Sequence, residues 1–529
     1  MNRKKEIWAI FIGLASLSLL VLITIFSIVF SNYIYLVFSF ALFWITSVIL
    51  SFYILNSTRI SNIKLCWIFV CLSLPLIGVT LFLLFGINPL RKKNLQSYLK
   101  RQESLNKFEN YDDTNKFLVE QTSSEIQQIV QYGYNISHRP IYFQNAVKII
   151  NPQPDFYKET ISLIREAKKT ICMQFYIYAD SVFFKTVISE IVKKAKDGVK
   201  VYIIYDWVGI NRRVKKRIWK KLMQLSSNIK VSVFNPWSFT IFTSKTNFRS
   251  HRKCIIVDNK KAIYGGSNIS DEYLCFRSNT SIWSDLNCVI EGPIVNSLSL
   301  LFKLDWIYYC RQINPTFCSN KLLEIPPVYF LPIGDSNDFV SNGKFLEVKS
   351  QLFDSSPDYN EKSVRDLILQ LIGKAKKRIW IITPYFIVGE DIMNVLRAAA
   401  LSGVDVKIIL PGQPDDKKYI LTVNRSSYLR LIEVNIHVYE YQGFCHSKLI
   451  IFDNELVTLG TFNFDFRSFY INFESALLLI SKDLNKYCES YFKKMLENCT
   501  RINANSFSSR LWKRIYWRMS LINVYHPLM

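Results

Sequence analysis

Three long apolar runs stand at the start of the chain, and no comparable run follows residue 90. They cover residues 6–30, 32–55 and 65–87, and only the first carries a charge, at its very start. About 20 apolar residues cross a bilayer core of about 30 Å, so each run is long enough to span it. The pattern predicts a retained transmembrane anchor over residues 1–90. A cleaved signal peptide is the alternative for the first run, but that run is too long and no small-residue cleavage site closes it.

The topology of the anchor depends on the third run. Pro75 and Gly78 interrupt this run, Arg59 and Lys64 precede it, and the basic cluster 91–93 follows it. Because positive charges tend to stay on the cytoplasmic side, both flanks are expected on the same side of the membrane. A kinked or re-entrant hairpin satisfies that rule, and three plain spans are the alternative.

A polar body follows the anchor. Residues 91–150 are polar and helix-prone and are interpreted as a connecting region. Two similar halves are expected over residues 151–325 and 351–500, with a Pro-rich linker at 326–350 between them. A basic, aromatic tail covers residues 501–529.

The two halves repeat one order of helices and strands. In each, a basic amphipathic helix leads into an apolar strand, and a second helix ending at Gly198 or Gly403 leads into another strand. Alternation of this kind predicts a layered α/β fold, and its recurrence indicates an internal duplication.

One short motif occurs once in each half. The stretches RSHRKCIIVD and FCHSKLIIFD both contain His, one residue, Lys, four residues and Asp, although the whole chain has only five histidines. A single copy on a strand is ordinarily a surface pair. Two copies in matching positions of two repeats favour a catalytic role, and the motif residues are His251, Lys253, Asp258, His446, Lys448 and Asp453.

Strand geometry sorts the motif residues. Side chains two apart along a strand point to the same face, so His251 and Lys253 are expected side by side, as are the corresponding residues of the second motif. Asp258 lies seven residues after its His and is expected on the other face or past the strand end. The aspartates are therefore interpreted as orienting groups, without direct contact to substrate.

A neutral cluster follows each motif, GGSN in the first half and GTFN in the second. Glycine allows a ligand to approach the backbone closely. The hydroxyl and amide side chains of Ser267, Asn268, Thr461 and Asn463 add groups that donate hydrogen bonds to phosphate oxygens. Together with two lysines, the clusters predict a phosphodiester site that needs no metal.

Two histidines allow a divided reaction. One neutral imidazole attacks phosphorus and forms a phosphohistidine, while the other protonates the leaving alcohol and later activates the incoming alcohol. The result is transfer in two displacement steps. His138, His437 and His526 lack this context and are not predicted to react.

The net charge and the cysteines limit which partners and ligands the chain is expected to bind. A formal net charge of +24 predicts an anionic partner. Because the body follows a membrane anchor, the bilayer and its acidic lipids are a simpler partner than nucleic acid, for which no binding module is recognisable. The eleven cysteines form no CxxC pair, so reduced, buried thiols are expected. Neither a metal site nor a cofactor is predicted, and the oligomeric state is left open.

The doubled His-x-Lys-x4-Asp resembles the signature of the phospholipase D superfamily, and other stretches resemble bacterial cardiolipin synthases. They are IKLCWIFVCLSLPLIGVTLFLLFGINPLRKK in the anchor, WSDLNCVIEGP, ITPYFIVGEDIMNVLRAAALSGVDVKIILPGQPD and GTFNFDFRSFYINFE. The resemblance runs from about residue 32 onward. It implies a duplicated phospholipase D-like α/β fold in which two halves share one active site.

The reaction implied by the resemblance is transfer of a phosphatidyl group between two phosphatidylglycerol molecules, which yields cardiolipin and glycerol at a bacterial cell membrane. By motif match the six motif residues form the active site, and Asp285 and Glu474 are the acids that pair with its histidines. By analogy with other members of the superfamily, the resemblance implies that His251 is the nucleophile and that His446 is the general acid and base. A hydrolytic phospholipase D that releases phosphatidic acid is the closest alternative. A nuclease and an inactive membrane scaffold are more distant ones.

Overall fold

The computed structural model describes part of the chain, which divides into two compact units. The first comprises Met1–Asn94, Trp237–Phe248 and Ser520–Met529, and the second Leu95–Pro236 and Arg249–Met519. The described residues are 25, 29, 33–57, 61–86, 119–120, 122–210, 214, 217–236, 248–274, 283–313, 345–357, 362–414 and 418–503. Most of the first apolar run, the basic cluster 91–93, most of the linker and most of the C-terminal tail lie outside them.

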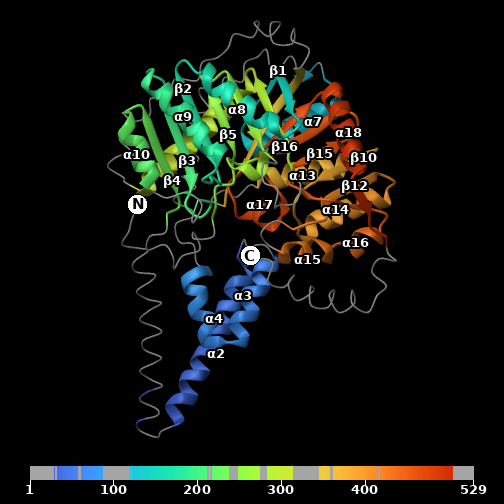
Figure 1. The fold of residues 1–529 in the computed structure, drawn as a ribbon. Helices are drawn as coiled ribbons and strands as arrows, with labels where there is room; N and C mark the ends of the chain where they lie inside the picture. Colours follow the sequence, from blue (N-terminus) through green and yellow to red (C-terminus); the bar gives the residue numbers. More distant parts are fainter. Residues whose placement is uncertain are drawn as a thin grey trace. The chain divides into compact units, whose positions relative to one another are not determined.

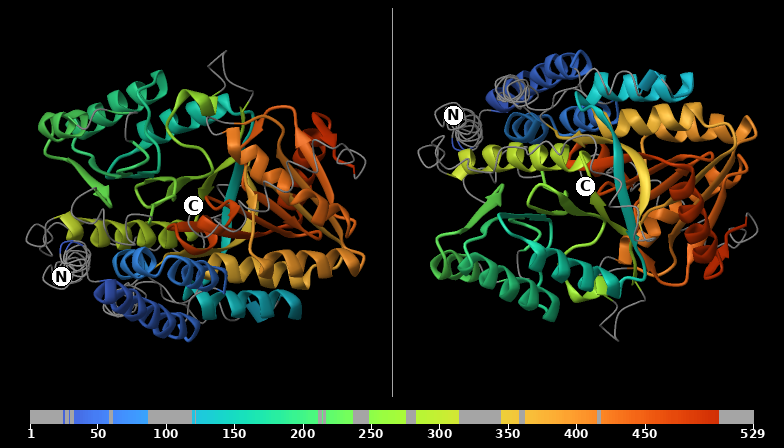
Figure 2. Two further views of the ribbon diagram at one scale, coloured as in Figure 1. Left: turned by 90° about the horizontal axis from the view of Figure 1, so that it is seen from below. Right: turned by 90° about the horizontal axis from the view of Figure 1, so that it is seen from above.

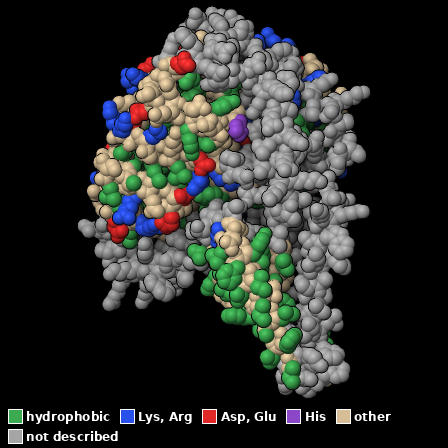
Figure 3. Space-filling model, turned by 180° about the vertical axis from the view of Figure 1, so that it is seen from behind, with side chains coloured by type: hydrophobic (Ala, Val, Ile, Leu, Met, Phe, Trp, Pro, Cys, Tyr) green, Lys and Arg blue, Asp and Glu red, His purple; other side chains and the backbone are tan. Residues whose placement is uncertain are grey.

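The first unit is helical. It contains α2 (Tyr33–Leu55), α3 (Ser61–Ser73), α4 (Pro75–Leu81) and a π-helical turn (Phe82–Gly86). The interruption expected at Pro75 is present, because Leu74 leaves the helical conformation and the proline opens α4. Many large apolar side chains on these helices are exposed, as Figure 3 shows on one face. Within the described part of the chain, no helix combines the length and the apolar character needed to cross a membrane.

The second unit is built on one mixed sheet of fifteen strands (Figure 1). Its centre is the antiparallel pair β1 and β9. Outward from this pair, the first half runs β1-β8-β6-β5-β2-β3-β4 and the second runs β9-β18-β16-β15-β10-β12-β13-β19. The two halves therefore repeat one strand order about the central pair, and Figure 2 shows them on either side of it. This confirms the duplicated α/β fold.

Each half has its own strands and short ladders. In the first half they are β1 (Ile141–Ile150), β2 (Thr170–Phe175), β3 (Lys200–Asp206), β4 (Ile229–Phe234), β5 (Cys254–Val257), β6 (Lys261–Gly265), β7 (Trp283–Ser284) and β8 (Asn287–Glu291). In the second they are β9 (Leu346–Ser355), β10 (Arg378–Ile382), β11 (Phe386–Ile387), β12 (Asp405–Pro411), β13 (His437–Tyr441), β14 (Phe444–Cys445), β15 (Leu449–Phe452), β16 (Leu456–Gly460), β17 (Phe464–Asp465), β18 (Glu474–Ile480) and β19 (Cys499–Arg501).

Helices cover both faces of this sheet. In Figure 2, α8 and α11 lie on opposite sides of the first half, and α13 and α18 on opposite sides of the second. The helices are α7 (Ser124–Ser137), α8 (Pro154–Glu166), α9 (Val182–Lys196), α10 (Arg217–Leu225), α11 (Ile294–Ile313), α13 (Ser363–Lys374), α14 (Glu390–Leu401), α15 (Lys418–Ser426), α16 (Tyr428–Ile432), α17 (Phe466–Tyr470) and α18 (Lys482–Leu496), with a 3₁₀ helix at Asp271–Leu274.

The inner strands are buried on both faces, as the apolar runs CIIV and LIIF predict. A hydrophobic core fills each half, and equivalent isoleucines of equivalent strands lie in them: Ile171, Ile203 and Ile255 in one, Ile379, Ile408 and Ile450 in the other. The helix-ending glycines are also as expected, since Gly198 and Gly403 have φ of 94° and 91°, a conformation that favours glycine.

Residues 91–150 differ from the expected connecting region at their C-terminal end. Here α7 packs on α13 and β9, and β1 is a central strand of the sheet. The apolar positions of β1 are interrupted by Gln144 and Asn145, where the β1–β9 register shifts. The irregular pairing hides the two-residue period by which a strand is recognised.

Candidate active site

Both motif pairs stand just before an inner strand. His251 and Lys253 lie in extended chain that leads into β5, and His446 and Lys448 in the chain that leads into β15. The sequence predicts them to be strand residues, whereas in the structure each strand begins directly after the lysine. Both lysines are almost fully buried, at 1% and 2% exposed. The apolar strands fix these side chains because each strand is locked between two neighbours in the sheet.

Each histidine is held by a carboxylate from the other half. His251 Nδ1 lies 2.9 and 3.1 Å from the two carboxylate oxygens of Glu474. His446 Nδ1 lies 2.7 Å from Oδ2 of Asp285. The structure thus brings both predicted acids to the histidines, but each acid pairs with the histidine of the other half and not with the histidine of the motif that it follows. Because an ionised carboxylate only accepts, the proton of each ring sits on Nδ1 and leaves Nε2 with the lone pair.

The backbone repeats this crossing. The N–H of His251 donates to the carbonyl of Phe473 at 2.9 Å, and Phe473 directly precedes Glu474. The N–H of His446 donates to the carbonyl of Ser284 at 2.6 Å, and Ser284 directly precedes Asp285. Each acid and its histidine are therefore tied twice, once through side chains and once through the main chain.

The lysines differ between the two sites. Lys448 Nζ lies 2.7 Å from Nδ1 and 3.0 Å from Nε2 of His446. Lys253 Nζ donates at 2.6 Å to the carbonyl of His251, and no described residue hydrogen-bonds to Nε2 of that ring. The imidazole of His251 is consequently the one whose Nε2 remains open to an incoming atom.

Burial governs the charge state of the histidines and lysines. It lowers the pKa of His251 and, aided by Lys448, lowers the pKa of His446 to about 3, so both rings are neutral near pH 7. Burial also lowers the pKa of Lys448 to about 8 and holds that of Lys253 well below its usual range.

The two acids behave in the opposite sense. Burial alone raises a carboxyl pKa, but Lys448 and His446 bring the pKa of Asp285 below its usual value. His251 and Lys253 do the same for the pKa of Glu474. Near pH 7 the site therefore holds two neutral rings beside two ionised carboxylates, with Lys448 mostly protonated.

The residues after the motifs build the walls around the acids. Thr461 donates to Glu474 at 2.6 Å, and Ser468 and Asn472 contact the other oxygen of that carboxylate. The equivalent of Thr461 in the first half is Gly266, where a Cβ would lie 2.4 Å from Oδ1 of Asp285. Glycine is required there because the shorter Asp285 occupies the space that a side chain would take.

The other predicted phosphate ligands bond mainly within their own loops. Ser267 exchanges hydrogen bonds with Asn287, and Asn268 bonds the backbone of Ile177 and the Tyr273 hydroxyl. The amide N–H₂ of Asn463 donates to Asp465. All are buried, and they shape the loops around the histidines.

Asp258 and Asp453 do not reach the histidines. The carboxylate of Asp258 accepts from the backbone N–H groups of residues 168–170, and that of Asp453 from residues 376–378. Both aspartates follow the strand end in left-handed backbone, at φ of 52° and 45°. Seven extended residues span about 20 Å, so these groups hold the far end of the strand. Of the two expected placements, the one past the strand end is observed, and both aspartates bond away from the histidines.

Sequence reasoning missed the aromatic rings beside the histidines. Tyr176 lies edge-on to His251 at 5.4 Å between ring centroids, and Tyr273, Trp283 and Phe444 lie 5.2–6.0 Å from His446. Trp283 stands two residues before Asp285 in WSDLN, which is the one signal in the sequence.

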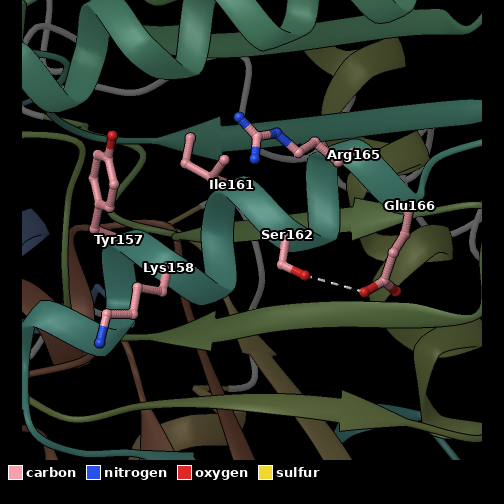
Figure 4. A pocket seen from close by; sticks show the side chains of 6 residues that line it. All are labelled: Tyr157, Lys158, Ile161, Ser162, Arg165 and Glu166. Carbon is pink, nitrogen blue, oxygen red and sulfur yellow. Dashed lines mark hydrogen bonds between the residues drawn. The ribbon is translucent and has the colours of Figure 1, made fainter.

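A separate pocket carries none of the predicted residues. It has a volume of about 510 Å³ and lies along α8, lined by Tyr157, Lys158, Ile161, Ser162, Arg165 and Glu166 (Figure 4). The other described histidines are likewise elsewhere, since His138 caps α7 and His437 accepts from Arg501. His526 lies outside the described residues.

The fold and the paired His–acid sites define a phospholipase D-like protein. The family described as "Cardiolipin synthase, PLD-like domain" matches residues 160–306 and 368–496, one segment in each half. The chain belongs to this family. The crystal structure of phosphatidylserine synthase from Haemophilus influenzae Rd KW20 shares the fold, with a TM-score of 0.55 at 15% identity over 76% of this chain and 100% of that one.

Curated relatives extend the match over most of the chain. A cardiolipin synthase of Clostridium perfringens (strain SM101 / Type A) is 32% identical over 88% of this chain and 93% of its own length. A cardiolipin synthase of Halalkalibacterium halodurans is 30% identical over 90% of each chain. Cardiolipin synthase 2 of Bacillus cereus is 29% identical over 89% of this chain and 88% of its own.

Proposed function

We propose that the protein is a cardiolipin synthase that transfers a phosphatidyl group from one phosphatidylglycerol molecule to another, with release of glycerol. The observation that carries the proposal is the pair of histidines, each bound at Nδ1 to an ionised acid of the opposite half. Membership of the cardiolipin synthase family supports phosphatidyl transfer as the class of reaction. Asp285, Glu474 and the two motif lysines support it by placing both signs of charge around the rings.

In the first step, Nε2 of His251 attacks the phosphorus of one phosphatidylglycerol. The bond from phosphorus to the glycerol oxygen breaks, and His446 gives that oxygen a proton. The bound phosphodiester anion raises the pKa of His446, which therefore takes up its proton together with the substrate. The products of this step are free glycerol and a phosphatidyl group on His251.

In the second step, His446 accepts a proton from the terminal hydroxyl of a second phosphatidylglycerol. The resulting oxygen attacks phosphorus, and the bond to His251 breaks. We assign attack to His251 because Nε2 of His446 contacts Lys448 at 3.0 Å, whereas Nε2 of His251 has no hydrogen-bond partner among the described residues. Lys253 and Lys448 donate hydrogen bonds to the phosphoryl oxygens in both steps, and Lys448 adds a positive charge.

The membrane part of the proposal rests on the sequence. The apolar runs 6–30, 32–55 and 65–87 hold the chain in the cell membrane as a multi-pass anchor, and the net charge of the whole chain, +24, attracts anionic lipid. Its test is labelling by a membrane-impermeant thiol reagent in sealed vesicles, with cysteines introduced on either side of each run. Accessibility of both flanks of the run 65–87 from one side establishes the hairpin topology. Accessibility from opposite sides establishes plain spans.

The reaction is tested with purified full-length protein and radiolabelled phosphatidylglycerol in mixed micelles, with and without a chelator. Cardiolipin and glycerol in equal amounts, unchanged by the chelator, are expected. Phosphatidic acid as the sole product would replace the proposal by the hydrolytic alternative. Failure to convert any phospholipid would overturn both.

A further inference from the structure

The residue between His251 and Lys253 is a buried arginine. Arg252 is 2% exposed, and its guanidinium donates hydrogen bonds to four groups of the described residues. Nε donates to the carbonyl of Glu474 at 3.1 Å, and one terminal nitrogen donates to Asp305. The other donates to Asp354 at 3.3 Å and to the carbonyl of Ser355 at 3.1 Å.

These partners belong to both halves. Asp305 lies on α11 of the first half, whereas Asp354, Ser355 and Glu474 lie on β9 and β18 of the second. Glu474 and Ser355 are paired residues in the ladder between those strands. Arg252 therefore contacts both members of the rung that carries the acid of His251.

The contacts close a ring. Glu474 binds His251 through its carboxylate and binds Arg252 through its carbonyl, and Arg252 is covalently joined to His251. A closed ring restricts the acid and the imidazole more than two separate bonds do, because neither can shift without straining the other. Phe473, one residue before the acid, adds a ring 5.6 Å from the guanidinium.

The second motif has no such clamp. Its middle residue is Ser447, whose hydroxyl pairs with the Tyr491 hydroxyl at 3.2 Å. Since Ser447 leads into β15 as Arg252 leads into β5, the strand itself requires no arginine. A buried ion pair is also weak evidence for stability, since desolvation offsets its attraction. Arg252 differs from Ser447 because it binds the backbone of Glu474 and of Ser355, the residue paired with Glu474 in the sheet.

We propose that Arg252 is a positioning residue that holds Glu474 against His251 across the boundary of the two halves. The effect on turnover rests on the proposed function, and the effect on the histidine does not. Among the described residues, the charged groups that act on His251 are Glu474, Lys253, Lys448 and Asp465. Of these, Glu474 is the one that Arg252 touches.

The test compares Arg252→Lys with Arg378→Lys. Arg378 is a matched control, because its guanidinium bonds the carbonyl of Asp453 and the side chain of Asn485 over the ring of Trp380, at the far end of the second motif. Arg252→Lys is expected to lower kcat about 10²-fold with KM changed less than about threefold, as a small displacement of a reacting group does. Arg378→Lys should change neither.

Two further readouts separate positioning from stability. Displacing Glu474 lowers the pKa of His251, so the acid limb of kcat/KM moves to lower pH in Arg252→Lys and stays in Arg378→Lys. In a Glu474→Gln background, Arg252→Lys should cost less than about threefold, because both act through one contact. A lower Tm with unchanged kcat and acid limb, or independent losses in the double variant, would overturn the proposal.

A measurement without substrate keeps the two proposals distinct. With only five histidines in the chain, selective ¹⁵N labelling allows His251 to be titrated by NMR, its signal identified by its loss in His251→Asn. A lower titration midpoint in Arg252→Lys supports positioning even if the wild type makes no cardiolipin. An unchanged midpoint overturns it. If Arg252→Lys does not fold, Asp305→Asn, which leaves the guanidinium in place, should give a smaller shift in the same direction with a smaller loss of kcat.

Discussion

The two histidine sites are built on one plan but are equipped differently. Glu474 is held by Thr461, Ser468 and Asn472, and its backbone is bound by a buried arginine. Asp285 has the N–H of Leu286 and stands close to Lys448, with three aromatic rings around its histidine. The strand order is the same on both sides, except that the second half has the additional edge strand β19.

The difference teaches that duplication preserved the frame while the surroundings of the two rings diverged. The acid of His251 stands in a polar network, and Nε2 of His251 has no hydrogen-bond partner among the described residues. The imidazole of His446 contacts Lys448 and is surrounded by the rings of Tyr273, Trp283 and Phe444. We therefore expect the pKa of His446 to respond strongly to a bound anion. One ring is suited to forming a bond with phosphorus and the other to moving a proton.

The largest expected effect comes from removing each ring. His251→Ala should lose about 10⁴-fold or more in cardiolipin formation, and His446→Ala about 10²–10⁴-fold, the usual worth of a general acid and base. A phosphatidyl ester of p-nitrophenol, whose leaving group needs no proton, separates the roles. His446→Ala should release a burst of one nitrophenolate per enzyme in stopped flow, and His251→Ala none. The reverse pattern would exchange the two assignments.

The acids come next. Glu474→Gln and Asp285→Asn each remove the charge that orients a ring, and each should lower kcat about 10–100-fold, as loss of such orienting groups does in other sites. Steady-state rates with labelled phosphatidylglycerol measure the effect, with circular dichroism spectra as the check on folding. Wild-type rates in either variant would show that the corresponding crossed pair is not used.

The alkaline limb of the pH profile sharpens the contrast between the lysines. Because the pKa of Lys448 is about 8, raising the pH through that value removes a positive charge from the phosphate site, and kcat/KM should fall. Lys448→Arg keeps its charge, so the limb should move to higher pH although the rate is lower. An unmoved limb in the arginine variant would assign it to another group.

The fold itself should weaken in mild acid. His446 in the unfolded chain takes up a proton near pH 6.5, whereas in the folded protein its pKa is about 3. Its contribution is present above pH 6.5 and is lost as the pH falls toward 3, at about 1.4 kcal/mol per pH unit. Denaturant unfolding of the wild type and His446→Asn between pH 4 and 7 measures it. Parallel pH dependence in the two proteins would contradict the assignment.

The smallest effect on catalysis belongs to the far end of the motif. Asp453→Asn weakens the bonds to the backbone of residues 376–378, so Tm should drop by about 2–8 °C. The kcat per folded molecule should stay within about threefold of the wild type. A loss of kcat comparable to that of Glu474→Gln would return Asp453 to the catalytic group.

Local pattern predicted much of this arrangement. Periodicity and glycine positions identified the repeated helices and strands, and residue chemistry singled out His251 and His446. The acids came from the resemblance, since the partners in each pair lie 223 and 161 residues apart and nothing local connects them. Such pairs depend on the fold of the sheet.

Other features were beyond the sequence for physical reasons. β1 was missed because its register shift breaks the two-residue period. The position of Asp258 past the strand was predictable from parity, but its bonds to residues 168–170 depend on the neighbouring strand. Arg252 reads as a spacer in the motif, and only its tertiary contacts reveal a role.

The crossed pairs have a consequence for ancestry. Since the acid of each histidine belongs to the other repeat, one repeat alone contains a histidine and an acid that cannot meet. A single-repeat ancestor would have formed its sites only as a symmetric dimer, with each copy completing the other. Fusion of two copies would join the partners permanently and leave the two sequences free to diverge.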